Sequence, residues 1–322
     1  MIRKLAALAA AALAFASLLP AAHAQGWPNR TTITVVVPLA PGDGGDITAR
    51  AMSELLSRDL EAPVVVVNKP GAGGALGVQS VISSHKDGFT VLFTQNSPLT
   101  IRRVLEPSTA NYDPLKDLIP LGITTRSPSV LVVRKDAPFH SFQEMVAYAK
   151  KNPGRVRIGN AGPGSAGDLS VQLINSVAGT DLDSIPYKGA APSINDVIGG
   201  QVEGVILALG AVSAHIKSGT LRPIAISSEF PELPEVPTLT RLGYRQDLLG
   251  VWFAWMLPAG TPDDVVQELT GALHKATRNG DVASRLLPFG LVQDWEPANR
   301  VATEVTHEYD TIVQVTSKLR KP

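Results

Sequence analysis

The chain has 322 residues, with 29 basic and 29 acidic side chains and no cysteine. Such a length suits two packed α/β domains, and the balanced charge excludes a basic footprint for nucleic acid or a polybasic membrane patch. The absence of cysteine excludes disulfides, thiol chemistry and zinc–thiolate sites, so an exported form of the chain must rely on its buried core.

The first 24 residues have the pattern of a secretory signal peptide. A short basic start at Arg3 and Lys4 precedes an Ala- and Leu-rich core, which ends in small residues at Ala22 and Ala24. The apolar core is short for a spanning helix, so a retained anchor is the weaker alternative. We expect cleavage after Ala24, a mature net charge of −2 and periplasmic localisation.

Short apolar runs alternate with helical patterns along the mature chain, which is typical of a parallel sheet with covering helices. Strands are expected at 33–37, 64–67, 90–94, 130–133, 156–159, 204–207 and 222–226. Helices are expected at 47–60, 74–84, 142–150, 168–178 and 194–198, and in the C-terminal part at 262–277, 282–287 and 298–317. No low-complexity linker separates two domains, so the chain must cross directly between them.

The first predicted strand runs into a glycine-rich turn before the first helix. Gly42, Gly44 and Gly45 permit a tight turn, and bare glycine amides at a helix N-terminus form a ready anion site. Asp43 and Asp46 also have a simpler interpretation, as an N-cap and a first-turn acid that stabilise the helix. The direction of these two side chains is left open by the sequence.

A second junction of the same design follows the strand expected at 156–159. It contains Gly162 and Gly164, and then Ser165 and Asp168 with the spacing of a capping box. A capped, glycine-lined N-terminus still offers free amides and a hydroxyl group to an anion. If each of two domains contributes one junction, the two junctions face one another across a cleft.

Other motifs that carry chemistry are incomplete. The glycine cluster at 69–77 has Leu76 where a dinucleotide fingerprint needs glycine, and it lacks the Gly-Lys-Ser/Thr of a P-loop. Pro163 stands where a hydrolase elbow around Ser165 needs glycine, and the histidines are scattered. We therefore expect no metal and no cofactor, and a secreted hydrolase is the alternative to a binding protein.

Short motifs occur in a fixed order over essentially the whole mature chain. They are Trp27-Pro28, Val36-Val37-Pro38, Pro41-Gly42, Asp46-Ile47-Thr48-Ala49-Arg50, Asn68-Lys69-Pro70-Gly71-Ala72-Gly73-Gly74, Asp87-Gly88-Phe89-Thr90, Gly162, Gly164-Ser165, Pro186-Tyr187-Lys188-Gly189, Gly199-Gly200-Gln201-Val202 and Pro258-Ala259-Gly260-Thr261-Pro262. In this order they resemble the Bug-type periplasmic solute-binding proteins of tripartite tricarboxylate transporters.

The resemblance implies an α/β, two-lobed periplasmic binding protein, similar to type II, with a ligand cleft between two α/β domains. The first lobe is expected at 25–125 plus 250–322 and the second at 126–249. Such a protein closes on a small carboxylate, performs no catalysis and delivers the ligand to integral membrane permease subunits. We expect a monomer; an adaptor that reports ligand occupancy to a membrane signalling protein is a further alternative.

The resemblance also implies which residues hold the ligand, because family members bind it through two loops, one from each lobe. The first loop supplies Pro38, Leu39, Ala40, Gly42, Asp43, Gly44, Gly45 and Asp46, and the second supplies Gly162, Gly164, Ser165, Ala166 and Asp168. Backbone amides, hydroxyl groups and water are expected to make most of the contacts.

Three positions depart from the family pattern and leave the ligand open. The family often has Pro-Phe-x-x-Gly-Gly where this chain has Pro38-Leu39-Ala40-Pro41-Gly42-Asp43, so Asp43 stands in place of the second glycine. Asp168 stands where a histidine is common, and Leu207 stands where an aspartate is common. If Asp43 points into the cleft, the ligand should also carry an amine, as in an amino acid or a nicotinamide-like compound. If it caps the helix, a dicarboxylate or tricarboxylate remains open, and an aromatic acid is also allowed.

Overall fold

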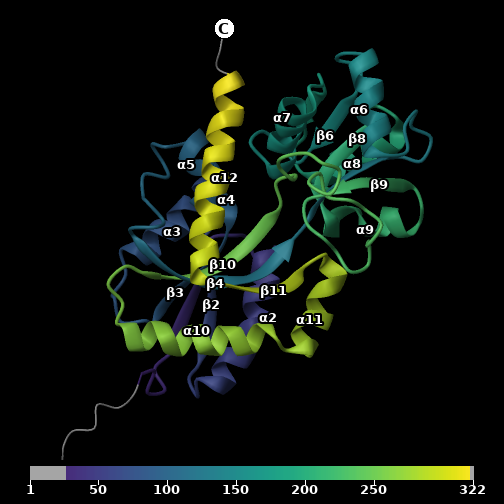
Figure 1. The fold of residues 1–322 in the computed structure, drawn as a ribbon. Helices are drawn as coiled ribbons and strands as arrows, with labels where there is room; N and C mark the ends of the chain where they lie inside the picture. Colours follow the sequence, from purple (N-terminus) through teal and green to yellow (C-terminus); the bar gives the residue numbers. More distant parts are fainter. Residues whose placement is uncertain (1–26, 320–322) are drawn as a thin grey trace, which may run out of the picture.

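The computed structural model describes residues 27–319, so the predicted signal peptide lies outside the described residues. Two lobes, each a mixed sheet with helices on both faces, make up this part of the chain (Figure 1). The first lobe is defined here by a six-stranded sheet and the second by a five-stranded sheet. The two-lobed α/β fold class is thereby confirmed.

The sheet of the first lobe has the strand order β11-β4-β10-β3-β1-β2. Its strands are β1 (Ile33–Val37), β2 (Val64–Asn68), β3 (Thr90–Gln95), β4 (Leu118–Ser127), β10 (Val251–Pro258) and β11 (Val292–Pro297). Its helices are α2 (Gly44–Asp59), α3 (Ala75–Ile82), α4 (Asn96–Leu99), α5 (Ile101–Leu105), α10 (Asp263–Thr277), α11 (Gly280–Leu286) and α12 (Ala298–Leu319), with short 3-10 turns at Ala72–Gly74 and Leu287–Phe289.

The sheet of the second lobe has the strand order β7-β6-β8-β5-β9. Its strands are β5 (Ser129–Arg134), β6 (Arg157–Asn160), β7 (Asp183–Pro186), β8 (Gly204–Ala208) and β9 (Leu221–Ile226). Its helices are α6 (Phe142–Lys151), α7 (Ala166–Ala178), α8 (Ala190–Gly199) and α9 (Leu209–Lys217).

The expectation of a parallel sheet holds for only part of each sheet, because both sheets are mixed. β1 pairs in parallel with β2 and β3, but β10 runs antiparallel to β3 and β4, and β11 runs antiparallel to β4. In the second lobe β6 is parallel to β7 and β8, whereas β5 is antiparallel to β8 and β9. The parallel part of each sheet places several strand ends at one edge, where ligands of α/β proteins bind.

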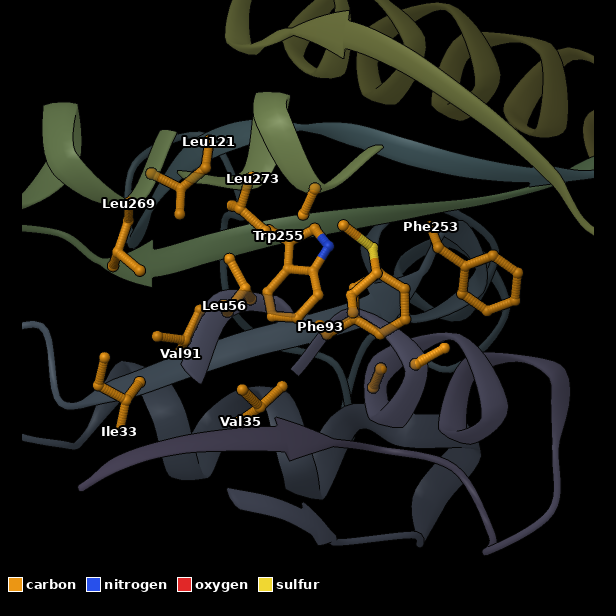
Figure 2. Packing of buried hydrophobic residues seen from close by; sticks show 14 of the residues in the cluster. Ile33, Val35, Leu56, Val91, Phe93, Leu121, Phe253, Trp255, Leu269 and Leu273 are labelled. Carbon is orange, nitrogen blue, oxygen red and sulfur yellow. The ribbon is translucent and has the colours of Figure 1, made fainter. Parts of the chain in front are cut away.

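The core of the first lobe is organised around β10, which is buried on both faces. Trp252 and Met256 belong to a cluster with residues of α3 and α12, whereas Trp255 belongs to the opposite cluster with residues of α2, α10 and α11. Figure 2 shows Trp255 beside Phe93, with ring centroids 4.6 Å apart. Burial of each such aromatic side chain contributes about 1.5–3 kcal/mol.

The chain passes between the sheets at two places. It leaves the first sheet at Ser127 and enters the second at Ser129, and it returns between Ile226 and Val251. The two-segment first lobe and the residue bounds given above for the lobes stay predictions.

The lobes also touch through α12, which runs between α5 and α7 in Figure 1. Ile101 of α5, Leu169 of α7 and Ile312 of α12 form one buried apolar cluster, with Leu105 and Leu249 packed against it. This cluster joins a helix of the second lobe, α7, to two helices of the first lobe, α5 and α12.

Within residues 27–319, none of the helices combines the length and the apolar character that a membrane crossing requires.

Candidate functional site

A cavity of about 270 Å³ lies between the lobes. The first lobe contributes the end of β3 and the beginnings of α4 and α5, and the second contributes the turn before α7 and the end of β8. Its polar lining residues are Gln95, Asn96, Ser97, Arg102, Ser129 and Ser165. Because both sheets supply lining residues, a ligand held here would contact both lobes.

The turn before α7 is organised by its own side chains. Ser165 is the N-cap, and its Oγ accepts a hydrogen bond from the amide of Asp168 at 3.2 Å, as the capping-box spacing predicted. The carboxylate of Asp168 accepts hydrogen bonds from the amide of Gly164 at 2.8 Å and from the hydroxyl of Ser184 at 2.6 Å. Asp168 therefore shapes the turn instead of presenting an unpartnered carboxylate to the cavity.

Two amides at the start of α7 are available to a ligand. The amides of Ala166 and Gly167 have no hydrogen-bond partner within the described part of the chain, and both residues line the cavity. A Cβ on Gly167 would collide with the carbonyl of Ile206, so glycine is required for this close approach of α7 to β8. Free amides at the positive end of a helix dipole favour an anion.

The turn before α2 has the same internal design. Asp43 is the N-cap, and its carboxylate accepts a hydrogen bond from the amide of Gly45 at 3.1 Å. Asp46 is buried and accepts hydrogen bonds at 2.9 Å from the amide of Gly42 and from Asn68. Both acids therefore stabilise their own turn, so the argument for an amine-bearing ligand loses its main support.

The charge of Asp46 is compensated locally. Burial raises the pKa of Asp46, but hydrogen bonds from Arg50, Gly42 and Asn68 lower it more, so the net pKa lies below its usual value. The ion pair with Arg50 has an N–O distance of 2.9 Å. The carboxylate is thus held ionised as a structural element of the loop.

The structure places the predicted site residues in two groups. Gly164, Ser165 and Ala166 line the cavity, while Gly162 and Asp168 build the turn behind them. The first-loop residues are outside the residues that line this cavity, and they are Pro38, Leu39, Ala40, Gly42, Asp43, Gly44, Gly45 and Asp46. Their contact with a ligand stays a prediction.

Sequence reasoning missed the half of the cavity that the first lobe supplies. Gln95 ends β3, and Asn96 and Ser97 follow it; the carboxyl end of β3 lies beside that of β1. Their position after a predicted parallel strand was a usable signal. Arg102 lies on the five-residue helix α5, which is too short to show the hydrophobic periodicity that predicts a helix.

Asn96 is anchored from behind by a buried acid. Its Nδ2 donates to both carboxylate oxygens of Glu308, at 2.7 and 2.9 Å, and the indole of Trp252 donates to the same group at 2.9 Å. Burial raises the pKa of Glu308 to about 7, although hydrogen bonds from Asn96, Thr100 and Trp252 oppose the rise. The end of β3 is thereby fastened to α12.

A larger cavity of about 560 Å³ lies where the chain crosses between the lobes, and Glu308 is part of its wall. Two of its arginines, Arg126 and Arg300, are already paired with Glu296 and Glu304. Its wall also contains Arg245, Asp247 and Glu308. Because its charges are mixed, whereas the smaller cavity includes the free amides at the start of α7, we take the smaller cavity as the candidate site.

The described residues contain no arrangement typical of a catalytic centre at Ser165. The Ser165 hydroxyl donates to Oδ1 of Asn160 at 3.4 Å and accepts from an amide, and no histidine is among its partners within residues 27–319. In the same part of the chain, no group of three or more His, Cys, Asp or Glu residues could hold a metal ion.

Comparisons with known proteins show the family of the chain. Residues 48–315 match the model of the tripartite tricarboxylate transporter family receptor. Protein BugT of Bordetella pertussis is 35% identical over 270 residues, which cover 83% of this chain and 82% of that protein.

Three solved structures share the fold. A TctC solute-binding protein from Polaromonas, solved without ligand, has a TM-score of 0.83 at 26% identity and covers 91% of this chain and 100% of its own. The periplasmic binding protein BugD has a TM-score of 0.68 at 29% identity and covers 89% of this chain and 97% of its own. MatC from Rhodopseudomonas palustris, with bound malate, has a TM-score of 0.68 at 28% identity and covers 88% of this chain and 99% of its own. The chain therefore belongs to the tripartite tricarboxylate transporter receptors, a family of Bug-type periplasmic solute-binding proteins.

Proposed function

We propose that this chain captures a small dicarboxylate in the 270 Å³ cavity and delivers it to the integral membrane subunits of a tripartite transporter. The observation that carries the proposal is the pair of free amides at Ala166 and Gly167, which face a cavity lined by both lobes. Amides at a helix N-terminus bind a carboxylate without a dedicated basic side chain. The bound malate of MatC supports the choice of a dicarboxylate.

Binding acts through the relative position of the lobes. A ligand that contacts both lobes stabilises the conformation in which its two sets of contacts are made together. The two chain crossings, near Pro128 and between Ile226 and Val251, are the natural hinge segments. The permease would then recognise the ligand-bound shape, and no bond of the ligand is made or broken.

The proposal includes export to the periplasm, with cleavage after Ala24, and a monomeric mature protein. Mass spectrometry of the protein released from the periplasm should give a chain that begins at Gln25. Size-exclusion chromatography with light scattering should give the mass of one chain. Copurification from membranes should recover permease subunits in a ligand-dependent manner, whereas recovery of a signalling kinase would favour the adaptor alternative.

A thermal-shift screen of the mature protein tests the binding function. The panel contains monocarboxylates, dicarboxylates, tricarboxylates, aromatic acids, amino acids and nicotinamide-like compounds. A ligand at a hundredfold excess over its Kd adds about 2.7 kcal/mol, and each kcal/mol shifts Tm by about 2–4 °C for a chain of this size. A rise confined to dicarboxylates is expected, and a rise with amino acids alone would contradict the proposal.

Two serine N-caps of the second lobe provide a matched test of the site. Ser165 and Ser141 each accept a hydrogen bond at 3.2 Å from the amide three residues on, but Ser165 lines the cavity and Ser141 does not. Each change to alanine should cost about 1 kcal/mol of stability. Only Ser165→Ala should also weaken dicarboxylate binding, and neither protein should convert its ligand. Equal affinities in the two variants would place the site elsewhere.

A further inference from the structure

Arg102 is the only charged side chain among the described residues that line the 270 Å³ cavity. It lies on α5 of the first lobe, and its side chain is 27% exposed. Its guanidinium packs across Gly73, where any larger residue would collide with it. A single positive charge in an otherwise neutral wall defines one pole of the cavity.

The hydrogen-bonding capacity of Arg102 is only partly used. Nη1 pairs with Oε1 of Glu106 at 2.5 Å, one helical turn further on, but Nε is buried and has no hydrogen-bond partner. A buried donor without a partner carries a desolvation penalty, and the pairing with Glu106 does not remove it. The Glu106 carboxylate is 44% exposed, and an exposed pair of this spacing contributes little, so a ligand carboxylate can compete for the guanidinium.

The other positive pole belongs to the opposite lobe. The free amides of Ala166 and Gly167 lie at the N-terminus of α7, in the wall contributed by the second lobe. A ligand with one carboxylate can satisfy only one of these two poles. A ligand with two carboxylates can satisfy both, and in doing so it connects the two lobes.

We propose that Arg102 is a specificity-determining residue that receives the second carboxylate of the ligand, so that the cavity selects dicarboxylates over monocarboxylates of similar length. This inference rests on the proposed binding function of the same cavity. It assigns the first carboxylate to the start of α7 and the second to the guanidinium, which exchanges part of its pairing with Glu106 for the ligand.

Isothermal titration calorimetry with succinate, malate and adipate, and with butyrate as the monocarboxylate, tests the assignment. Arg102→Gln should weaken binding of the preferred dicarboxylate by about 10- to 100-fold, the usual range for loss of a charge-assisted hydrogen bond. Its effect on butyrate should stay within about twofold, because butyrate has no second carboxylate to pair with the guanidinium. Glu106→Gln should strengthen dicarboxylate binding, because it frees the guanidinium.

Arg103 offers a matched control on the same helix. It faces Asp113 at 3.9 Å and lies 4.9 Å above the ring of Tyr309, and it does not line the cavity. Arg103→Gln removes the same charge one residue away, so it should leave dicarboxylate affinity within about twofold of wild type. If both arginine variants lose the same amount of dicarboxylate affinity, the loss comes from the long-range effect of a removed charge. That result would overturn the specific role of Arg102.

The outcomes separate this inference from the proposed function. Wild-type protein that binds dicarboxylates, with unchanged affinity in a folded Arg102→Gln variant, overturns the role of Arg102 and leaves the binding function standing. Equal weakening of butyrate and dicarboxylates by Arg102→Gln also overturns it. Wild-type protein that binds none of these acids overturns the proposed function, and the inference falls with it. Circular dichroism and Tm of each variant establish that it is folded.

Discussion

The buried carboxylate of Glu308 and the side-chain amide of Asn96 are joined by hydrogen bonds of 2.7 and 2.9 Å, which link α12 to a residue of the candidate cavity. The hydroxyl of Thr100 lies 3.0 Å from Glu308 and 3.0 Å from the carbonyl of Asn96. Its one proton can serve either acceptor. The ionised acid can accept from Thr100, and the protonated acid can donate to Thr100 while Thr100 donates to the carbonyl, so both forms are hydrogen-bonded.

Glu308 should make stability depend on pH. The folded pKa of about 7 lies above the reference value of 4.5, so the folded state binds this proton more tightly than the unfolded state. The free energy of unfolding should therefore fall as pH rises from about 4.5 to about 7, and level off above that. Glu308→Gln, which resembles the protonated acid, should remove this decline in urea titrations across the same interval.

The comparison for Glu308 must allow for other groups. Burial also raises the pKa of Asp294, and this residue is present in both proteins, so the difference between wild type and Glu308→Gln isolates Glu308. Identical pH slopes in the two proteins would show that folding does not raise the pKa of Glu308. Glu308→Ala should be less stable than Glu308→Gln at every pH, because it leaves the donors of Asn96 and Trp252 without their acceptor.

Substitution of Gly164 should disturb the contact between the turn before α7 and helix α5 of the other lobe. Its φ is +68°, and a Cβ there would lie 2.6 Å from Cδ1 of Leu105 on α5. Gly179 has nearly the same φ, +64°, and a Cβ there would meet nothing within 4 Å. Each change to alanine should cost about 1–2 kcal/mol for the left-handed backbone, but only Gly164→Ala should also weaken ligand binding.

A second variant checks the cause of this effect. If the collision with Leu105 is responsible, adding Leu105→Ala to Gly164→Ala should recover part of the lost affinity, and calorimetry of the four proteins of the cycle measures the coupling. Additive losses would mean that Gly164 acts through its own turn and not through α5.

The two acids of the first junction should differ in their effect on stability. Asp43→Ala removes one N-cap hydrogen bond and should cost about 1 kcal/mol. Asp46→Ala leaves the amide of Gly42 and the side chain of Asn68 without their acceptor and should cost about 2–4 kcal/mol. Urea unfolding measures both values, and a smaller loss for Asp46→Ala than for Asp43→Ala would contradict the role assigned to its buried carboxylate.

Asp46 should also contribute to acid sensitivity. Its folded pKa lies below the reference value of 3.8, so the stability that it provides is complete above that pH and is lost as pH falls through the folded pKa. Asp46→Asn should flatten the acid limb of the stability profile relative to wild type.

Much of the fold could be predicted from the sequence, because apolar runs and capping residues are local signals. The strand at Ile33–Val37 has the predicted bounds, and the helices at Phe142–Lys151 and Asp263–Thr277 differ from them by one residue. β10 was missed, because a strand buried on both faces is a continuous apolar run without alternation. β4 was missed because Pro120 and Gly122 interrupt it; they flank a register shift in its pairing with β10.

The candidate site could be predicted only in part. The turn at 162–168 was found because strand, glycines and capping residues are contiguous in the chain. The wall from the first lobe depends on which segments the fold brings together, and Arg102 and Gly167 are 65 positions apart. No local sequence pattern predicts that these two residues line the same cavity.

The position of β10 has a consequence for how the chain is made. β4 pairs only with β10 and β11, and both lie beyond residue 250, after the whole sheet of the second lobe. Until the ribosome has synthesised that last part, β4 has no neighbour in its sheet and β3 has an open edge. The second sheet comes from one continuous stretch and can assemble first. We therefore expect the first lobe to remain incomplete for most of synthesis, which would keep the growing chain accessible to export machinery that requires unfolded polypeptide.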